Sequence, residues 1–414
     1  MTVKYEPNPT VTFGGAVTYA NETISSISIR MGRNDVIEQP QPGFASIRLW
    51  TDASQVLNVS LSQSVTIAIA KGTSGTQEIF NGTISDIDIS LEAYGSKGSI
   101  AVYTITAVGA LALLNRHLSG LNNFAKEFDG TRIVNILSDA FLTSWQDVSL
   151  TLQWNQLPNT LTWQNYDAVN QSLIDNLVTN IDTPGVYELE AYTGGATNAL
   201  TLAQNAAQSG RGVLWENNAG EIVYDDYSSR QAASPYTLTA NDLLAEGLTT
   251  NAQWGEIVNQ ATVTYRAGEA YARDESSNLL YGELNGRRTT QLHNLADAQT
   301  QANDFILTRA YPRMYPDVLT VPLHSPTVTD ATRDQMAAVY CGLRVATTAL
   351  PAVFGTTFDG FVEGWTWNLT RYTADLSLTC SAYSETYSSI IWLQIPPTTT
   401  WAGYTPSTTE WQDL

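Results

Sequence analysis

The sequence predicts a mainly β protein with an α+β insert, short helices and an extended C-terminal tail. Three observations support this fold class: strand-like alternation in residues 1–110, helical periodicity in residues 111–245, and a return to strand-like alternation in residues 246–395. The chain has 414 residues, and at roughly 150 residues per domain this length suggests about three domains. We therefore expect two β-rich regions that flank a mixed segment.

Residues 1–110 contain four runs in which apolar and polar residues alternate with the period of a β-strand: Ile27–Arg30, Ser46–Leu49, Val65–Ile69 and Val102–Ile105. Between the first two runs, two prolines and two glycines within Met31–Phe44 argue against a continuous ladder. We expect a loop between neighbouring strands at this point. Short strands at this spacing predict a small barrel or sandwich.

Residues 111–245 change to helical periodicity. Apolar residues from Ile133 to Phe141 recur at the spacing of an amphipathic helix, and Asp129 is placed to cap its start. Further helices are expected over Leu173–Asn180 and Ala196–Gln208. The stretch Gly212–Tyr224 predicts a β-hairpin with its tip at residues 217–220.

Residues 246–395 are predicted to be β-rich again, with one helix. Apolar residues within Leu295–Arg309 share one helical face, and Pro312 ends that helix. The predicted strands are Ile257–Tyr265, Val318–Val321, Gly342–Thr347, Phe361–Leu369 and Asp375–Thr379. From Pro396 onward the chain is rich in Pro and Thr, so residues 396–414 are expected to form a loose tail.

The charge balance argues against a nucleic-acid-binding surface. Acidic residues outnumber basic ones by 40 to 20, which gives a net charge of −20, whereas electrostatic binding to nucleic acid needs a basic patch. The N-terminus has no apolar core of signal-peptide length, and no stretch approaches the roughly 20 apolar residues that span a bilayer. We therefore expect a protein with no membrane segment that is made in a cytoplasm.

The residues that most often carry chemistry do not form a site in this sequence. The three histidines, His117, His293 and His324, are scattered singly and make no metal-ligand pattern. Cys341 and Cys380 have no positioned base nearby in the sequence. We expect them to be small buried apolar residues, with a disulfide as the alternative.

Two acidic pairs invite a catalytic or calcium-binding interpretation. Asp86 and Asp88 alternate in a predicted strand, so both side chains share one face and are expected to be solvated. Asp225 and Asp226 lack the Gly and Glu positions of a calcium loop. We expect no catalytic residue, no cofactor and no metal site, and therefore a protein that is not an enzyme.

Tryptophans are abundant, with 11 in the chain, and they permit two interpretations. Trp365 and Trp367 alternate with Thr366, so they share one face of a strand, which favours packing or an interface. The alternative is a sugar-binding platform, to which several other tryptophans could contribute: Trp145, Trp154, Trp163, Trp392, Trp401 and Trp411.

Four segments follow one another in an order that carries a family resemblance. They are Ser28–Arg33 with Pro40–Leu49, Val213–Tyr224 continuing to Arg230, Leu238–Leu244 with Ile257–Tyr265, and the stretch from Leu279 through the helix to Trp365. Their order resembles that of the tail-tip hub proteins of long-tailed bacteriophages, also called minor tail proteins. These are related to the baseplate hubs of contractile injection machines.

The resemblance implies a homotrimer in which each subunit supplies two barrel-like β domains, residues 1–110 and 246–395, on either side of an α+β domain at 111–245. Three subunits would then present six similar units to a sixfold tail ring. The implied role is structural: a ring at the virion tail tip that closes or continues the tail tube, connects it to the distal tip proteins and leaves a central channel for DNA during genome ejection.

The partners that the resemblance implies are a distal tail ring protein, the tape-measure protein and other tail-tip or fibre proteins, with transient passage of viral DNA that is not specifically bound. Synthesis would take place in the host bacterial cytoplasm. From the charge count we further expect an acidic or neutral channel wall. The alternative function is that of a carbohydrate- or receptor-binding β-rich tail protein, which the abundant aromatic residues would support.

Overall fold

The computed structural model of the chain describes residues 5–20, 23–93, 99–120, 123–141, 180–231, 234–244, 248–251, 254–312 and 315–386. The expected tail at 396–414 lies outside these residues. So does the expected helix at 173–180, apart from Asn180, which belongs to the short strand β10 (Asn180–Ile181). None of the described helices is both long enough and apolar enough to cross a bilayer.

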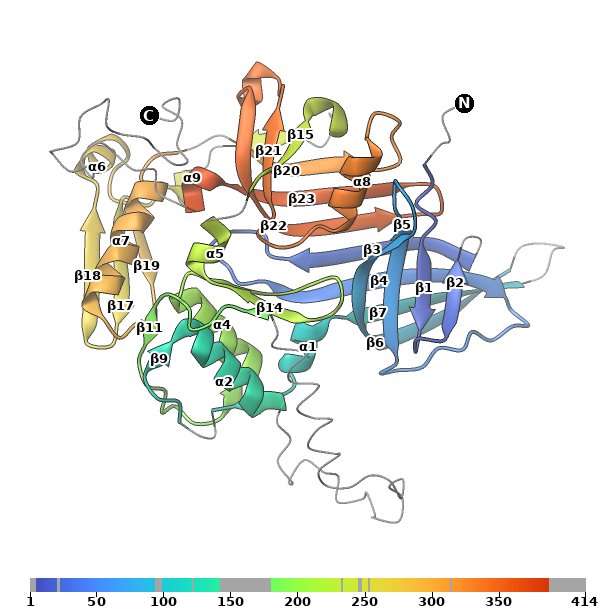
Figure 1. Cartoon of the computed structure of the whole chain (residues 1–414), viewed down its shortest axis with the longest axis horizontal. Coiled ribbons are helices and arrows are strands. Elements are labelled where there is room, and N and C mark those ends of the chain that lie inside the picture. The colour runs from blue at the N-terminus through green and yellow to red at the C-terminus, as the bar shows by residue number, and fades with distance from the viewer. Residues whose placement is uncertain are drawn as a thin grey trace, which may run out of the picture.

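The largest element is a 13-stranded sheet that combines strands from both ends of the chain (Figure 1). Along its main path the strands are β16 (Thr249–Asn251), β20 (Tyr315–Pro322), β23 (Ala374–Ala382), β22 (Thr357–Leu369), β3 (Ile24–Gly32), β4 (Gln41–Asp52), β7 (Ser99–Val108), β6 (Thr76–Ala93), β5 (Ser64–Ala70), β1 (Thr10–Phe13) and β2 (Val17–Ala20). A branch at β22 adds β21 (Arg344–Thr348) and β15 (Tyr236–Thr239).

The two predicted β-rich regions meet where β22 pairs with β3. The pairing is antiparallel, and it sets Trp365 opposite Met31 and Trp367 opposite Ile29. The expectation of a mainly β protein is therefore confirmed, and the two regions share one sheet. Among the described strands, the path runs from β16 to β2 without closing. The barrel-like form of the two regions stays a prediction.

The loop predicted between the first two strands is shorter than expected. Gln41 and Pro42 belong to β4, so the connection covers only residues 33–40. The ladder between β3 and β4 shifts register near Arg30 and Gly32, where Gln41 pairs with Gly32 and Phe44 with Arg30. Pro42 lies within this irregularity, where a missing N–H donor interrupts no regular ladder.

The mixed middle segment packs beneath the sheet around a second apolar core, which also contains residues from the range 261–310 (Figure 1). Its helices are α1 (Ala110–Leu114), α2 (Asp129–Phe141), α4 (Ala199–Ser209) and α5 (Tyr227–Gln231), and its short strands are β8 (Leu118–Ser119), β9 (Glu127–Phe128), β11 (Glu188–Leu189) and β12 (Thr197–Asn198). Helix α4 begins three residues later than predicted because the Asn198 side chain accepts the backbone N–H of Thr201 and so caps the helix there.

The predicted hairpin is confirmed as β13 (Val213–Glu216) and β14 (Ile222–Asp225). Its two faces are buried in different cores. Trp215 and Val223 pack in the core of the large sheet, whereas Leu214 and Tyr224 pack in the core of the middle segment. The hairpin therefore joins the two cores.

A third layer stands beside the middle segment. It holds the sheet β18 (Gly268–Arg273), β17 (Gln260–Tyr265) and β19 (Asn285–Arg288), with helices α6 (Glu275–Tyr281) and α7 (Leu295–Arg309). The bounds of α7 match the prediction. Two further helices, α8 (Asp330–Ala337) and α9 (Tyr383–Thr386), lie against the large sheet.

Candidate functional site

The structure keeps the three histidines apart. His117 is exposed, and the His293 Nδ1 atom lies 2.5 Å from a Glu190 carboxylate oxygen. His324 lies 3.5 Å from an Asp375 carboxylate oxygen. Within the described ranges, no group of three or more His, Cys, Asp or Glu side chains is arranged to hold a metal ion.

The two cysteines are buried free thiols. Burial raises the pKa of Cys341 to about 12 and raises the pKa of Cys380 as well. A thiol with so high a pKa is a poor nucleophile, because the thiolate is the reactive form. The expectation of small buried apolar residues is confirmed, and the disulfide alternative is not.

Of the two acidic pairs, Asp86 and Asp88 face solvent, whereas Asp225 and Asp226 accept hydrogen bonds from neighbouring residues. Asp86 and Asp88 are exposed on β6, as expected for a solvated face. Asp225 accepts a hydrogen bond of 2.7 Å from the Trp215 indole N–H, and burial raises the pKa of Asp225 to about 6. Asp226 accepts the backbone N–H groups of Ser228 and Ser229 at the start of α5. Each of the latter two carboxylates thus holds a local structure in place.

Trp365 and Trp367 are fully buried in the core of the large sheet. The interpretation that they pack is confirmed, and these two side chains cannot form an exposed sugar-binding platform. The other tryptophans proposed for such a platform, Trp145, Trp154, Trp163, Trp392, Trp401 and Trp411, lie outside the described residues.

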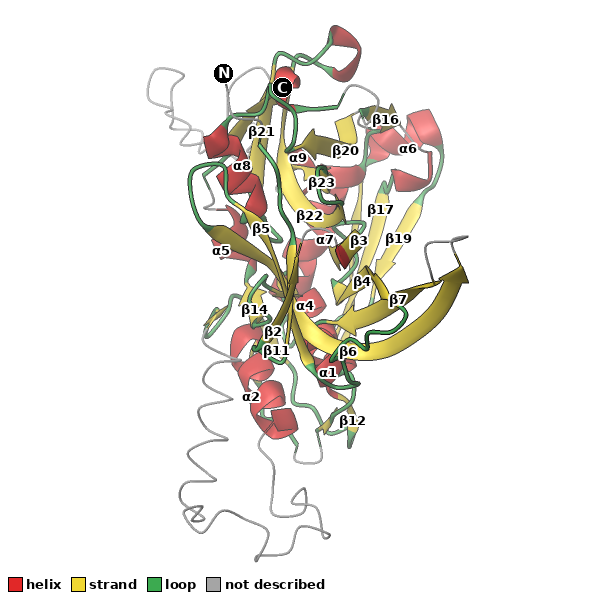
Figure 2. Ribbon diagram, turned by 90° about the vertical axis from the view of Figure 1, so that its right-hand side faces the viewer, coloured by secondary structure: helices red, strands yellow, loops and turns green. Residues whose placement is uncertain are grey.

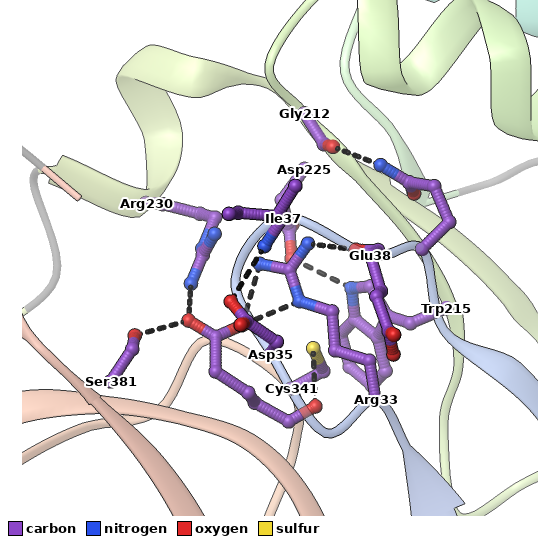
Figure 3. A network of polar contacts seen from close by, with 12 residues as sticks. Arg33, Asp35, Ile37, Glu38, Gly212, Trp215, Asp225, Arg230, Cys341 and Ser381 are labelled. Atoms are coloured by element: carbon purple, nitrogen blue, oxygen red, sulfur yellow. Dashed lines mark hydrogen bonds and ion pairs between the residues drawn. The ribbon is translucent and has the colours of Figure 1, made fainter. Parts of the chain in front are cut away.

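The most highly organised polar site is a buried ion-pair network that we call the Glu363 junction (Arg33, Arg230, Glu363 and Ser381; Figure 3). Arg33 Nε donates to one Glu363 carboxylate oxygen at 2.7 Å. The other oxygen accepts Arg230 Nη2 at 2.9 Å and the Ser381 hydroxyl at 2.5 Å. All four residues are at most 4% exposed.

The Glu363 junction joins segments that are far apart in sequence. Arg33 follows β3, Arg230 lies on α5, and Glu363 and Ser381 lie on β22 and β23. Arg33 also donates from Nη1 to the Glu38 carbonyl oxygen at 2.6 Å, which fixes the loop 33–40 (Figure 3). One carboxylate thus holds both halves of the large sheet to the middle segment.

Two glycines allow the backbones to approach closely enough to build the junction. The ladder between β22 and β23 shifts register between Val362 and Gly364, and this bulge re-aims the Glu363 side chain. A Cβ atom on Gly32 would lie 2.4 Å from the Glu363 carbonyl oxygen, and one on Gly364 would lie 2.4 Å from the Arg33 carbonyl oxygen. Gly32 also has a φ of +86°, a conformation that favours glycine.

The electrostatics of the junction keep Glu363 ionised. Burial would raise its pKa, but Arg230, Arg33 and the hydrogen bonds from Ser381 and Arg33 outweigh burial and lower the pKa to about 2. A carboxylate with such a low pKa, enclosed by two guanidinium groups, is not suited to exchange protons near neutral pH. Its contacts with Arg33, Arg230 and Ser381 indicate a structural role, which is to hold these segments together.

Two further buried carboxylates, Glu216 and Asp129, also connect separate segments of the chain through hydrogen bonds. Glu216, on the hairpin strand β13, accepts the backbone N–H groups of Gly43 and Leu111, the latter at 2.7 Å. Asp129 accepts the backbone N–H of Tyr187 at 2.9 Å and the Tyr224 hydroxyl, so it bridges α2 to β14 in addition to starting its own helix. Burial raises the pKa of Glu216 to about 7 and that of Asp129 to about 6.

The sequence interpretation did not single out Glu363 or Glu216 as a site. A signal was available for Glu363, since it is the one charged residue in the otherwise apolar run from Phe361 to Trp365. A charged residue in the middle of a buried strand needs a partner of opposite charge. The identity of that partner, more than 300 residues away at Arg33, has no local signal.

No protein-family model matches the sequence, and no curated protein matches it. Solved structures do. A 43 kDa tail protein of prophage MuSo2 from Shewanella oneidensis superposes with a TM-score of 0.57 at 10% identity, over 93% of this chain and 100% of that one. A tail protein from Neisseria meningitidis gives a TM-score of 0.58 at 13% identity, over 92% and 99% of the two chains.

Prophage tail protein gp18 from Listeria monocytogenes gives a TM-score of 0.51 at 11% identity, over 91% of this chain and 95% of that one. The similarity extends over nearly the full length of both chains in all three superpositions. At these identities it concerns the fold, and it agrees with the resemblance expected from the order of segments in the sequence. The chain therefore has the fold of these three tail proteins, two of which come from prophages.

Proposed function

We propose that the protein is a structural component of a phage tail tip. Three copies would form a hub ring that closes or continues the tail tube and connects it to the distal tip proteins, with a central channel for DNA. The barrel-like domains at 1–110 and 246–395 would supply six similar units toward a sixfold tail ring, with the α+β domain at 111–245 between them. The observation that carries the proposal is the tail-protein fold, which three solved tail proteins share over at least 91% of this chain.

An exposed strand edge supports self-association. The second half of β6 pairs with β7 on one side, whereas β5 covers β6 only as far as Thr83, so residues 86–93 have no partner strand on the other side among the described strands. Figure 2 shows β6 and β7 as a long curved ribbon that reaches away from the body. An open edge of this length is a template for pairing with another chain.

On one face of this ribbon, apolar side chains of β6 continue past the buried core and are exposed to solvent. Ile87, Ile89 and Leu91, which we call the apolar stripe, lie on the same face as their direct partners on β7, the buried residues Ile105, Tyr103 and Ala101. Ile89 is 62% exposed and Leu91 is 69% exposed. A neighbouring copy that covered this stripe would form the heterologous contact from which a closed ring is built.

Cryo-electron microscopy of assembled tails tests the proposed ring directly, because purified protein could stay monomeric until a partner ring templates it. We expect threefold density for this chain at the tail tip. Sixfold or monomeric occupancy would contradict the trimer. For the interface, the double variant Ile89→Asp/Leu91→Asp is expected to block incorporation into tails, whereas Val353→Asp, at an exposed apolar residue of similar exposure (70%) on another element, should be incorporated normally.

The acidic composition supports the proposed channel. An acidic wall repels a DNA duplex within about a Debye length, roughly 8 Å at physiological salt, and so keeps it mobile, whereas basic groups would bind its phosphates. In the tail structure, we expect Asp and Glu to outnumber Lys and Arg among the side chains that face the lumen. A basic lumen would refute this part of the proposal.

The proposed partners are a distal tail ring protein, the tape-measure protein and other tip or fibre proteins, and the proposed location is the virion tail tip after synthesis in the bacterial cytoplasm. The role needs no catalysis. Co-purification of tagged protein with tail components from infected or induced cells tests the partners. Recovery of the protein with none of them, in a preparation that contains intact tails, would argue against this location.

A further inference from the structure

A cavity beside the Glu363 junction concentrates positive charge in a chain whose net charge is −20. Its lining includes five arginines, and no acidic residue is among the described residues that line it: Arg33, Arg211, Arg230, Arg288 and Arg309. They come from the loop after β3, the connection after α4, helix α5, strand β19 and the end of α7. The cavity therefore lies where all three layers of the molecule meet.

Carboxylates behind the cavity wall balance part of this charge. Arg33 and Arg230 share the single carboxylate of Glu363. Arg211 forms an ion pair with Asp304, and its guanidinium carbon lies 4.1 Å from the centre of the Tyr227 ring. Arg309 lies 3.6 Å from an Asp35 carboxylate oxygen. Three carboxylates thus pair with four of the five arginines.

Among the five arginines that line the cavity, Arg288 is the one that forms no ion pair with a described residue. Its guanidinium carbon lies 4.6 Å from the centre of the Phe305 ring. Its Nε atom is buried and has no hydrogen-bond partner among the described residues. Burial, together with the charges of Arg211, Arg309 and Arg33, lowers the pKa of Arg288 to about 10, so the group still carries its proton at neutral pH.

We propose that this cavity binds a small oxyanion of the size of inorganic phosphate, with Arg288 as its principal ligand and Arg211 and Arg309 beside it. The planar guanidinium group offers paired N–H donors that match the oxygens of such an anion. The cavity volume is about 50 Å³, which is enough for a small ion. A bound anion would link β19, α4 and α7 and so fasten the three layers together.

Titration calorimetry with inorganic phosphate tests the site on the full chain, with chloride at equal ionic strength as the reference. We expect the unaltered protein to bind phosphate and the variant Arg288→Gln to bind it at least tenfold more weakly. Arg287→Gln is the matched control. Arg287 is the preceding residue on β19, its side chain is 64% exposed, and it pairs with Glu269 outside the cavity. This variant should bind phosphate like the unaltered protein.

Circular dichroism verifies that each variant is folded before titration. If Arg288→Gln is unfolded, Arg288→Lys replaces it, because lysine keeps the charge without the paired donors and is expected to weaken binding. Three outcomes would overturn the proposal: no phosphate binding by the unaltered protein at millimolar concentration, equal binding by the unaltered protein and the Arg288 variant, or an equal loss in the Arg287 variant. An equal loss in the Arg287 variant would mean that phosphate binding depends on the general positive charge of the surface and not on this cavity.

Discussion

Replacement of Glu363 by glutamine perturbs the structure at the point where most segments meet. The variant Glu363→Gln keeps the shape of the side chain and the carbonyl oxygen that can accept the Ser381 hydroxyl. It removes the negative charge that faces Arg33 and Arg230, whose side chains are 2% and 3% exposed. Two guanidinium groups would then remain buried without a counter-charge.

The size of the effect follows from this burial. Removal of one partner from a buried ion pair typically costs about 3–5 kcal/mol, because the remaining charge is left desolvated and uncompensated. Here one carboxylate serves two arginines, so we expect a loss at the upper end of that range. Replacement of all three charges by apolar residues, as in Arg33→Met/Arg230→Met/Glu363→Leu, should cost much less than Glu363→Gln, since it leaves no unpaired charge.

Urea unfolding followed by tryptophan fluorescence measures the effect, because Trp215, Trp365 and Trp367 are all buried in the core that the junction adjoins. The matched control is Glu269→Gln, which breaks the exposed ion pair with Arg287 and should cost about 1 kcal/mol or less. If Glu363→Gln costs no more than this control, the junction does not hold the segments together and the reasoning is refuted.

Three further predictions concern pH, backbone and thiols. The folded-state pKa values of Glu216 (about 7) and Asp129 (about 6) lie above their ordinary values of 4.5 and 3.8, so the folded state binds more protons in this range and stability should rise as the pH falls from 8 to about 5. Below about pH 4.5 stability should fall again, because the unfolded chain takes up a proton at Glu363 whereas the folded state, in which the pKa of Glu363 is lowered to about 2, keeps this carboxylate ionised. Urea midpoints across the whole pH range check both trends, and the rise in stability between pH 8 and 5 should be smaller in Glu216→Gln. Gly32→Ala should destabilise the protein more than Gly75→Ala, because both glycines have positive φ but only Gly32 has a backbone oxygen 2.4 Å from the added Cβ; equal urea midpoints would contradict the close approach. Cys341 and Cys380 should react with a thiol reagent only in urea, and rapid labelling of the native protein at pH 8 would show that they are less buried than described.

The parts of the fold that the sequence predicted are those governed by local rules. Helix α7 was predicted to its limits because its apolar face repeats over 15 residues and Pro312 follows it. The hairpin β13–β14 was predicted because a turn-forming tip separates two short apolar runs. The tertiary environment moved other limits, as at α4, where Asn198 sets the start of the helix.

The order of strands in the large sheet was not predictable in this way. The pairing of β3 with β22 joins residues more than 300 positions apart, and alternation within each strand is compatible with many partners. The Glu363 junction could not be predicted for the same reason, because it depends on the pairing of strands that are far apart in the sequence. The sequence places Glu363 in an apolar strand, but only the pairing of β3 with β22, and the bulge next to Gly364, brings Arg33 to it.

The distribution of arginine connects the interior of the molecule with its proposed role. Lysine is rare in this chain, and several of the arginines are buried rather than exposed: Arg33, Arg132, Arg230, Arg309 and Arg333. Buried guanidinium groups can satisfy several acceptors at once, as Arg132 does by donating to Glu127 and to the carbonyl oxygens of Ala125 and Glu190. Positive charge is thus used to join segments inside the protein, and each buried arginine removes a basic group from the surface. The surface is therefore poorer in basic groups than the composition alone implies, which would suit the wall of the proposed channel, because few basic groups would be available to bind DNA phosphates.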